Sequence, residues 1–267
     1  MCTFLRLALA AIFSAAPMAL AQEPEHEMSC DEENWQSDRN SHCEINETTL
    51  PAMQSLVVDG GINGGVAVRG WQKKEILVRA RVQTAADTDA QVRAIARLIT
   101  IHTGGGRVVA DGPRAGRHEN WSVSYEVFVP QQIHLNLKAH NGGIHIADVH
   151  GRIEFETTNG GVVLRRLAGT VSGHTTNGGL SVELAGNHWE GEHLDASTTN
   201  GGVSVAVPAA YSAHLETGTV NGHINIDFPV TVRREINRQL SVDLGSGGPL
   251  VRAITTNGGV SIKRKDT

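Results

Sequence analysis

Long apolar runs are missing from most of this 267-residue chain. After the first 21 residues, no stretch approaches the roughly 20 apolar residues that a membrane-spanning helix needs, so we expect no membrane span. An excess of basic residues is missing as well, because 23 Lys and Arg stand against 28 Asp and Glu. Without a basic stripe to neutralise phosphates, nucleic acid is not an expected partner.

Cysteine is scarce, with three residues in the chain. Cys2 belongs to the leader described next, which leaves Cys30 and Cys43 as an even pair. In an oxidising compartment such a pair predicts one disulfide that closes a short loop. Two cysteines in an acidic loop do not supply the ligands of a zinc site, so no metal is expected there.

The first 21 residues have the pattern of a secretory signal peptide. Arg6 precedes an apolar run at 7–13, and Ala19-Leu20-Ala21 forms an A-x-A cleavage site. We expect cleavage after Ala21 and a periplasmic or secreted protein. Gln22 rather than cysteine takes the first mature position, so no lipid anchor is expected.

Acidic side chains are concentrated in residues 22–49, which carry nine Asp or Glu against one basic residue, Arg39. The remainder of the exported chain is nearly balanced in charge. We therefore divide it into an acidic arm at 22–49 that the disulfide staples, first strands with a capping helix at 50–135, and a repeat region at 136–267 that continues the same fold.

Aromatic residues make up 4% of the chain, which makes each tryptophan conspicuous. Trp71, Trp121 and Trp189 are candidates for ligand contact, because exposed aromatic side chains often dominate binding surfaces. With so few aromatic residues, the same three side chains could instead seal the core. Trp189 lies in an insertion between two repeats, and insertions in repeat proteins often gather on a functional face.

The tripeptide Asn-Gly-Gly recurs along the chain, and 18 residues separate the copies that begin at 141, 159 and 177. Further copies begin at 63, 200 and 257, and Asn221-Gly222 is a variant. The later gaps are 23, 21 and 36 residues, the last being twice 18. A fixed period with occasional insertions predicts stacked repeats.

Each repeat holds two short strands with alternating apolar residues, separated by corners where Asn and Gly tolerate a turn. If the repeats stack in register, the corner asparagines form a ladder whose amides donate and accept along the stack. These residues are Asn141, Asn159, Asn177, Asn200, Asn221 and Asn257. Thr-Thr pairs that precede four of them would form a second column.

We expect an all-β fold, a single-stranded parallel β-solenoid that is right-handed by analogy with common parallel crossovers. One short helix is predicted at 88–99, where Val92, Ile95 and Ile99 share a face and Asp87 or Thr88 caps the start. This helix would cover the open end of the stack. An antiparallel meander, in which Asn-Gly closes hairpins, is the alternative fold.

The blocks Thr-Thr-Asn-Gly-Gly-Val/Leu-Ser-Val/Ile at 175–182, 198–205 and 255–262 resemble the bacterial putative-adhesin family of unknown function, whose domains are glycine-rich β-helices. The resemblance covers 135–267 well and 55–80 moderately. It implies an exported β-solenoid with a surface or binding role. The resemblance brings no catalytic residues, and no barrel-forming transporter module accompanies it.

No catalytic centre is recognisable, and no cofactor or metal ion is expected. His134, His140, His145 and His150 are spaced so that strands would alternate their sides, which disfavours a shared metal. The carboxylates that a glycosidase or lyase would need are scattered without a recurring pair. They are Asp148, Glu154, Glu156, Glu183, Asp195 and Glu216, of which Glu156 is expected beside His174 as a surface contact.

Three functions follow from these observations. The first is an exported non-enzymatic binding or adhesive module for a cell-surface or envelope polymer or protein. The second is a structural envelope protein that associates with itself end to end, and the third is a carbohydrate-active enzyme. In the first case, outward strand positions would present the binding surface: His145, Arg165, Ser181, Ser204, Asn225 and Lys263.

Overall fold

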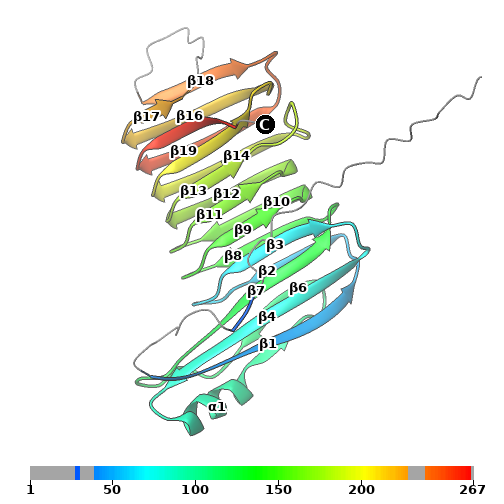
Figure 1. Ribbon diagram of the computed structural model, residues 1–267, viewed down its shortest axis with the longest axis vertical. Coiled ribbons are helices and arrows are strands. Elements are labelled where there is room, and N and C mark those ends of the chain that lie inside the picture. The colour runs from blue at the N-terminus through cyan, green and yellow to red at the C-terminus, as the bar shows by residue number, and fades with distance from the viewer. Residues whose placement is uncertain (1–27, 31–38, 228–237, 266–267) are drawn as a thin grey trace, which may run out of the picture.

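The computed structural model describes residues 28–30, 39–227 and 238–265. The expected signal peptide at 1–21 and much of the acidic arm therefore lie outside the described residues. In the described part the fold is all-β with one helix, and the strands form two sheets of ten strands each (Figure 1). Within the same ranges, no helix has the length and apolar character needed to cross a bilayer.

The first sheet, sheet A, runs from the acidic strand β1 to the short strand β17. Its strands in spatial order are β1 (Asn40–Pro51), β4 (Glu75–Ala86), β7 (Asn120–Pro130), β3 (Val66–Trp71), β9 (Ile144–Ala147), β11 (Val162–Arg165), β13 (Leu180–Glu183), β15 (Val203–Pro208), β20 (Val260–Lys265) and β17 (Ile224–Ile226).

The second sheet, sheet B, has β18 and β5 at its edges. Its strands in spatial order are β18 (Gln239–Leu244), β16 (Ala213–Asn221), β19 (Leu250–Asn257), β14 (His193–Asn200), β12 (Ala168–Asn177), β10 (His150–Thr157), β8 (His134–Ala139), β2 (Ser55–Asp59), β6 (Arg107–Asp111) and β5 (Thr100–His102). From β8 to β17 the chain alternates strictly between sheets B and A.

The core lies between the two sheets, because alternate residues of most inner strands point inward. On β11, Val162 and Leu164 are buried whereas Val163 is half-buried, and Val171 of β12 joins the same cluster from the other sheet. The core is built mainly from Val, Ile and Leu, which suit pleated surfaces. Successive copies of a position pack above one another, as Val162 does between Ile144 and Leu180.

The prediction of a single-stranded parallel β-solenoid is wrong. The right-handedness predicted for that solenoid therefore does not apply. Parallel pairing does hold through the repeats, but both sheets are mixed. β1 pairs antiparallel with β4 and β4 with β7, while β5–β6 and β16–β18 are antiparallel pairs in the other sheet. The Asn-Gly-Gly period predicts the arrangement of the repeats alone. The long strands β4 and β7 contain no Asn-Gly-Gly and pair antiparallel with each other.

The spatial order also departs from chain order at two places. β19 inserts between β14 and β16, and β20 inserts between β15 and β17, so the last repeat sits inside the stack (Figure 1). At the other end β3 lies between β7 and β9 and is parallel to both. The 36-residue gap before Asn257 therefore contains the edge strands β17 and β18, after which the chain inserts β19 and β20 one position inside the stack.

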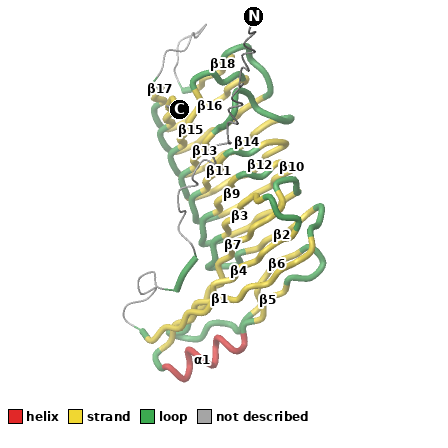
Figure 2. Tube along the Cα trace, turned by 45° about the vertical axis from the view of Figure 1, so that its right-hand side comes forward, coloured by secondary structure: helices red, strands yellow, loops and turns green. Residues whose placement is uncertain are grey.

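The predicted helix is present as α1 (Asp89–Leu98), with Thr88 as its N-cap. The Thr88 hydroxyl accepts from the backbone N–H of Gln91 at 3.3 Å, and the Gln91 side chain accepts from the backbone N–H of Thr88. Its buried face, Val92 and Ile95, packs on Ala86 at the end of β4. Figure 2 shows the helix at the end of the molecule formed by β1, β4 and β5.

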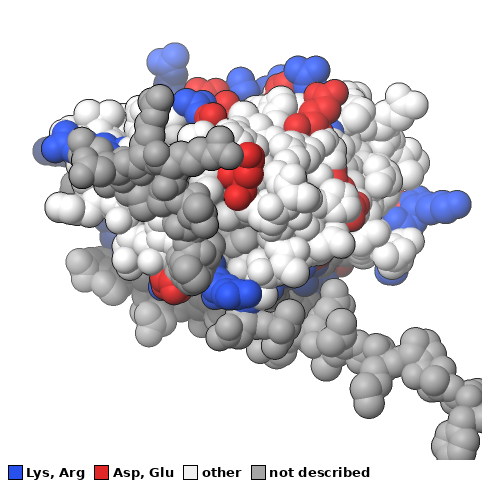
Figure 3. Space-filling view, turned by 90° about the horizontal axis from the view of Figure 1, so that it is seen from above, with Lys and Arg blue, Asp and Glu red and all other residues white. Residues whose placement is uncertain are grey.

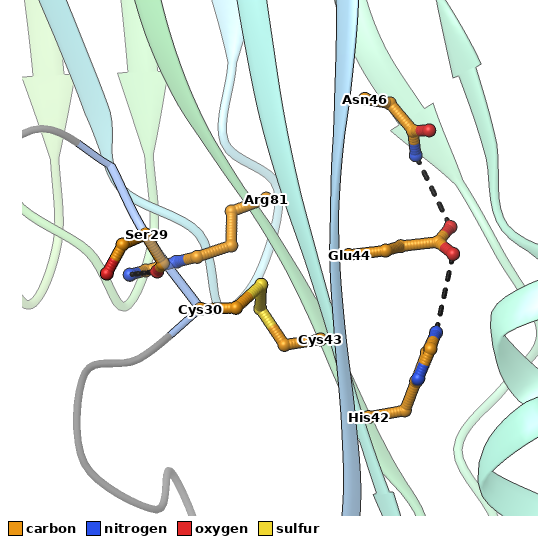
Figure 4. Close-up of a disulfide and its surroundings, with 7 residues drawn as sticks. All are labelled: Ser29, Cys30, His42, Cys43, Glu44, Asn46 and Arg81. Atoms are coloured by element: carbon orange, nitrogen blue, oxygen red, sulfur yellow. Dashed lines mark hydrogen bonds and ion pairs between the residues drawn. A yellow bond between two sulfur atoms is a disulfide. The ribbon is translucent and has the colours of Figure 1, made fainter.

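The predicted disulfide between Cys30 and Cys43 is confirmed, with 5.7 Å between the two Cα atoms (Figure 4). It fastens residues 28–30 to β1, and Arg81 of β4 donates to the backbone carbonyl of Ser29 at 3.1 Å. The second half of the expected arm is thus the edge strand β1, which pairs with β4 over its whole length.

Candidate ligand-binding groove

The Thr-Thr-Asn-Gly-Gly blocks lie where a strand of sheet B ends and the chain crosses to sheet A. The first threonine points inward, and its hydroxyl donates to the carbonyl of the first glycine in an adjacent block. Thr175 donates to Gly160 at 2.8 Å, and Thr157, Thr198, Thr255 and Thr219 do the same at 2.7–2.8 Å. These hydroxyls satisfy carbonyls that the core would otherwise leave without a partner.

The asparagine of each block belongs to a continuous ladder of side-chain hydrogen bonds. The structure brings together all six asparagines named from the sequence and adds Asn63 and Asn120 at one end. From that end the order is Asn120, Asn63, Asn141, Asn159, Asn177, Asn200, Asn257 and Asn221, joined by bonds of 2.7–3.2 Å. Every Nδ2 donates toward Asn120, so the ladder has one direction.

The first glycine of each block is required by the stacking. A Cβ on Gly160 would stand 2.1 Å from the carbonyl oxygen of Gly142, which is far inside contact distance. The equivalent distance is 2.0 Å at Gly178 and 2.1 Å at Gly201 and Gly258. Only a residue without a side chain allows the corners to approach this closely.

The second glycine is not required by the stacking in the same way in four of the blocks, whereas a Cβ on Gly143 or Gly65 would meet a backbone oxygen at 3.0 or 3.2 Å. A Cβ would meet its nearest backbone atom at 3.6 Å on Gly161 and Gly179, 3.5 Å on Gly202 and 3.7 Å on Gly259, all ordinary contact distances. None of these residues has the positive φ that favours glycine. Their missing side chains instead leave an open strip along the outer face of sheet A.

This strip forms a groove of about 730 Å³ across β9, β11, β13, β15, β20 and β17. The strands are in register, so one outward position of each lines the groove in a row: His145, Val163, Ser181, Ser204, Ser261 and Asn225. A hollow of about 220 Å³ beside His145 and Val163 continues it over β3 and β7. At about 4.8 Å per strand, eight strands give a length of about 34 Å.

The floor of the groove is uncharged and its rim carries both signs. The pKa of His145 is lowered by burial of its ring and by nearby Arg165, which favours the neutral imidazole. In the row of outward residues two positions further along each strand, Nε of Arg165 lies 3.8 Å from a carboxylate oxygen of Glu183. Glu183 also pairs with Lys265. Figure 3, which looks onto the β17 and β18 end, likewise shows acidic and basic side chains interspersed.

Of the surface positions named from the sequence, His145, Ser181, Ser204 and Asn225 line the groove. Arg165 and Lys263 lie one row further along the same face. The second glycines and Ser261 also line the groove but were not named from the sequence as binding positions. Their signal was in the sequence repeat, since five of the six Asn-Gly-Gly copies are followed two residues later by a small or polar residue, Val163 being the exception.

The three tryptophans have different surroundings. Trp189 is 2% exposed and donates from Nε1 to the carbonyl of Gly169, so it packs in the core and offers no surface to a ligand. Trp71 lies against Phe128, with Lys73 over its ring. Trp121 is half-buried and lines a separate pocket beside the loop that follows β6.

The histidines considered for a metal site lie on separate elements and have other partners. His134 Nδ1 accepts from the backbone N–H of Arg152, and His140 contacts the Thr158 hydroxyl. No cluster of three or more His, Cys, Asp or Glu able to hold a metal occurs in the described parts of the chain.

Most of the carboxylates considered for catalysis are paired with cations. Asp148 receives two hydrogen bonds from Arg166 at 2.7 Å, and Arg252 donates to Asp195 at 3.0 Å. Glu156 lies opposite His174 in the parallel register, as expected for a surface contact. These carboxylates therefore serve as cross-strand partners.

Comparison with known proteins gives no family assignment. No protein-family model matches the chain, and no curated protein matches it either. Among solved structures, a putative cell adhesion protein from Clostridium sporogenes has 11% identity and a TM-score of 0.41, covering 85% of this chain and 100% of its own. A putative adhesin from Bacteroides fragilis has 11% identity and a TM-score of 0.42, covering 83% and 97%.

A putative lipid binding protein from Parabacteroides distasonis has 12% identity and a TM-score of 0.32, covering 84% of this chain and 97% of its own. The neighbours include putative adhesins, as the sequence resemblance implies, while a family with glycine-rich repeats is not confirmed. Similarity at this level carries no argument about function.

Proposed function

We propose that this chain is an exported, non-enzymatic binding module of the adhesin type, and that it holds an extended, hydroxyl-rich polymer along sheet A. A polysaccharide of the cell surface or envelope has this chemistry. The periplasm or the cell exterior is the proposed location, since the Cys30–Cys43 disulfide is typical of an oxidising compartment.

The column of second glycines carries the proposal. Alanine would fit at Gly161, Gly179, Gly202 and Gly259 without a backbone clash, yet each position lacks a side chain. The fold therefore does not explain these four glycines. A groove that must stay open for a ligand lying along the stack does explain them.

The lining matches a neutral polar chain better than a charged one. Ser181, Ser204 and Ser261 present one hydroxyl per strand, and Asn225 adds an amide at the end of the row. Each hydroxyl can donate to and accept from a sugar hydroxyl, and such contacts repeat about every 4.8 Å along the groove.

A binding role without catalysis fits the surroundings of the acidic groups. Glycoside hydrolysis needs two carboxylates flanking one bond, with one of them free to donate a proton. Glu183, beside the groove, is held by Arg165, Arg166 and Lys265. We therefore favour a binding module over a carbohydrate-active enzyme as the function of this chain.

Self-association through sheet edges is supported less well. Short edge strands and edge charges both protect against pairing with another chain. The edge strand β17 has three residues, and the opposite edge strand β1 carries Glu44 and Glu47. In sheet B the edge strands are β5, which has three residues, and β18, which carries Asp243, so all four edges are short or charged.

A panel of soluble neutral and acidic polysaccharides, screened by thermal shift and then calorimetry, tests the proposal. Ser181→Leu should weaken binding of a neutral polysaccharide at least about tenfold, because it removes a hydroxyl and fills the groove. Ser172→Leu, on the outer face of sheet B, is the matched control and should bind normally. Failure of every polysaccharide to bind, or equal losses in both variants, contradicts the proposal.

Sedimentation across a range of protein concentrations separates the structural alternative. The binding module should remain monomeric as the protein is concentrated. Reversible assembly without a response to any polymer would favour a self-associating envelope protein instead.

A further inference from the structure

A second cavity, of about 370 Å³, lies away from the groove at the Asn120 end of the asparagine ladder. Its walls come from the turn after β2, the loop after β6 and the start of β7, and include Ile62, Pro113 and Trp121. The volume falls within the range of small-molecule sites. Trp121 donates from Nε1 to the Pro113 carbonyl at 2.8 Å, which fixes the loop that forms one wall.

Most of the wall is apolar, and one part of it is left open to solvent. Ile62 is 70% exposed beside the half-buried ring of Trp121. Ala110 and Val123 complete the apolar lining. Burying the exposed isoleucine and the apolar walls against the apolar part of a ligand would favour binding.

The polar part of the pocket is the end of the asparagine ladder. Asn120 accepts through Oδ1 from Asn63, while its Nδ2 donates to no group of the described residues. Because seven hydrogen bonds run in one sense toward this end, their amide dipoles add and strengthen the Asn120 N–H donors. The ladder thus presents polarised donors to the pocket, as a helix presents its N-terminus.

Two charged residues, Arg114 and Asp59, line the pocket, and together they favour a ligand with a single negative charge. Arg114 lines it and forms no ion pair with the described residues, so its guanidinium can meet an anion. Asp59 lines it too, 3.6 Å from Arg107 and accepting from the backbone N–H of Gly61. Asp59 would repel a dianion more strongly than a monoanion.

We propose that this pocket binds a small amphiphilic carboxylate, with its apolar body against Trp121 and Ile62 and its carboxylate on Asn120 and Arg114. The amide and the guanidinium both donate in a plane, which matches the two oxygens of a carboxylate. The site is separate from the polymer groove, and its ligand need not come from the same source.

Calorimetric titration of the exported chain with octanoate, octanol, octylamine and octyl phosphate tests the assignment. Octanoate should bind, and octanol and octylamine should bind at least about tenfold more weakly because they lack the anionic acceptor. Absence of octanoate binding, or equal binding of octanol, overturns the proposal. Tighter binding of octyl phosphate overturns the choice of a carboxylate.

Three variants locate the site. Asn120→Leu keeps the side-chain size but removes the donors, and Arg114→Gln alters an exposed loop residue, so each should weaken octanoate about tenfold or more. Asn221→Leu breaks the ladder at its far end and should leave octanoate binding within about twofold. Equal losses in Asn120→Leu and Asn221→Leu, or no loss in Arg114→Gln with folding intact by thermal unfolding, would overturn the site.

Discussion

Gly160 lies so close to the carbonyl oxygen of Gly142 that a Cβ at this position would stand 2.1 Å from that oxygen. The adjacent Gly161 would place its Cβ 3.6 Å from the nearest backbone atom. Two neighbouring glycines of the same corner therefore have different roles, one in stacking and one in keeping the groove open.

Alanine substitutions at these two glycines should have opposite effects on stability. Gly160→Ala forces backbone displacement and should lower the free energy of unfolding by about 1–3 kcal/mol or more. Gly161→Ala should raise it by about 0.4–1 kcal/mol, because alanine restricts the unfolded chain without a clash. Denaturant unfolding measures both, and similar losses in the two variants would contradict the distinction.

The two threonines of one block should differ as well. Thr175 is buried and donates to the Gly160 carbonyl, so Thr175→Val leaves that carbonyl without its partner and should cost about 1–3 kcal/mol. Thr176 lies on the outside, and Thr176→Val should stay within about 0.5 kcal/mol of the parent. Comparable unfolding free energies for the two variants would show that the hydrogen bond from the Thr175 hydroxyl to Gly160 does not stabilise the corner.

Removal of the Tyr125 hydroxyl should not weaken the protein. Tyr125 is 1% exposed, burial raises the pKa of its phenol, and its hydroxyl has no hydrogen-bond partner within the described ranges. Leaving a buried donor unsatisfied is unfavourable, so Tyr125→Phe should be neutral or stabilise by up to about 1 kcal/mol. A clear loss of stability in thermal unfolding would mean that this hydroxyl does find a partner.

The link between β16 and β18 should depend on pH. His214 Nδ1 lies 2.7 Å from Asp243, and this hydrogen bond, with the nearby charge of Glu216, raises the pKa of His214. The folded state thus favours the protonated imidazole. Its contribution to stability is complete below the ordinary pKa of about 6.5 and is lost as pH rises through the folded pKa.

Nuclear magnetic resonance titration of the His214 ring measures that pKa directly. Asp243→Asn should lower it, and should reduce the fall in stability between slightly acidic and slightly alkaline pH. Ser241 also faces the ring, from β18, but carries no charge, so Ser241→Ala should change the pKa less. An unshifted pKa in Asp243→Asn would contradict the proposed link.

The sequence predicts which residues meet at the corners of the repeats. It does not predict the order and direction of the strands in the two sheets. The asparagines and the inward threonines repeat at fixed positions, so their columns could be expected from spacing, and Thr88 marked the start of α1. Asn120 lies outside any repeat and joins the ladder because β3 inserts beside β7. Nothing in the local pattern encodes that insertion.

What was wrong or left open has physical causes of the same kind. The antiparallel strands β4 and β7 alternate buried and half-buried residues much as the parallel strands do, so periodicity could not separate the two arrangements. For Trp189 the sequence left ligand contact and core packing open, and the structure shows core packing, because the insertion folds its indole back to the Gly169 carbonyl. Burial there depends on a contact 20 residues away in the chain.

The most direct test of the polymer-binding groove combines stability and affinity in one variant. A triple substitution, Gly161→Ala, Gly179→Ala and Gly202→Ala, should raise the free energy of unfolding by about 1–3 kcal/mol in total, from the sum of single effects. The same variant should bind the polysaccharide selected by the wild-type chain at least about tenfold more weakly, because three methyl groups narrow the groove. Unchanged affinity in a stabilised variant would contradict the account, since the glycines would then have no part in binding.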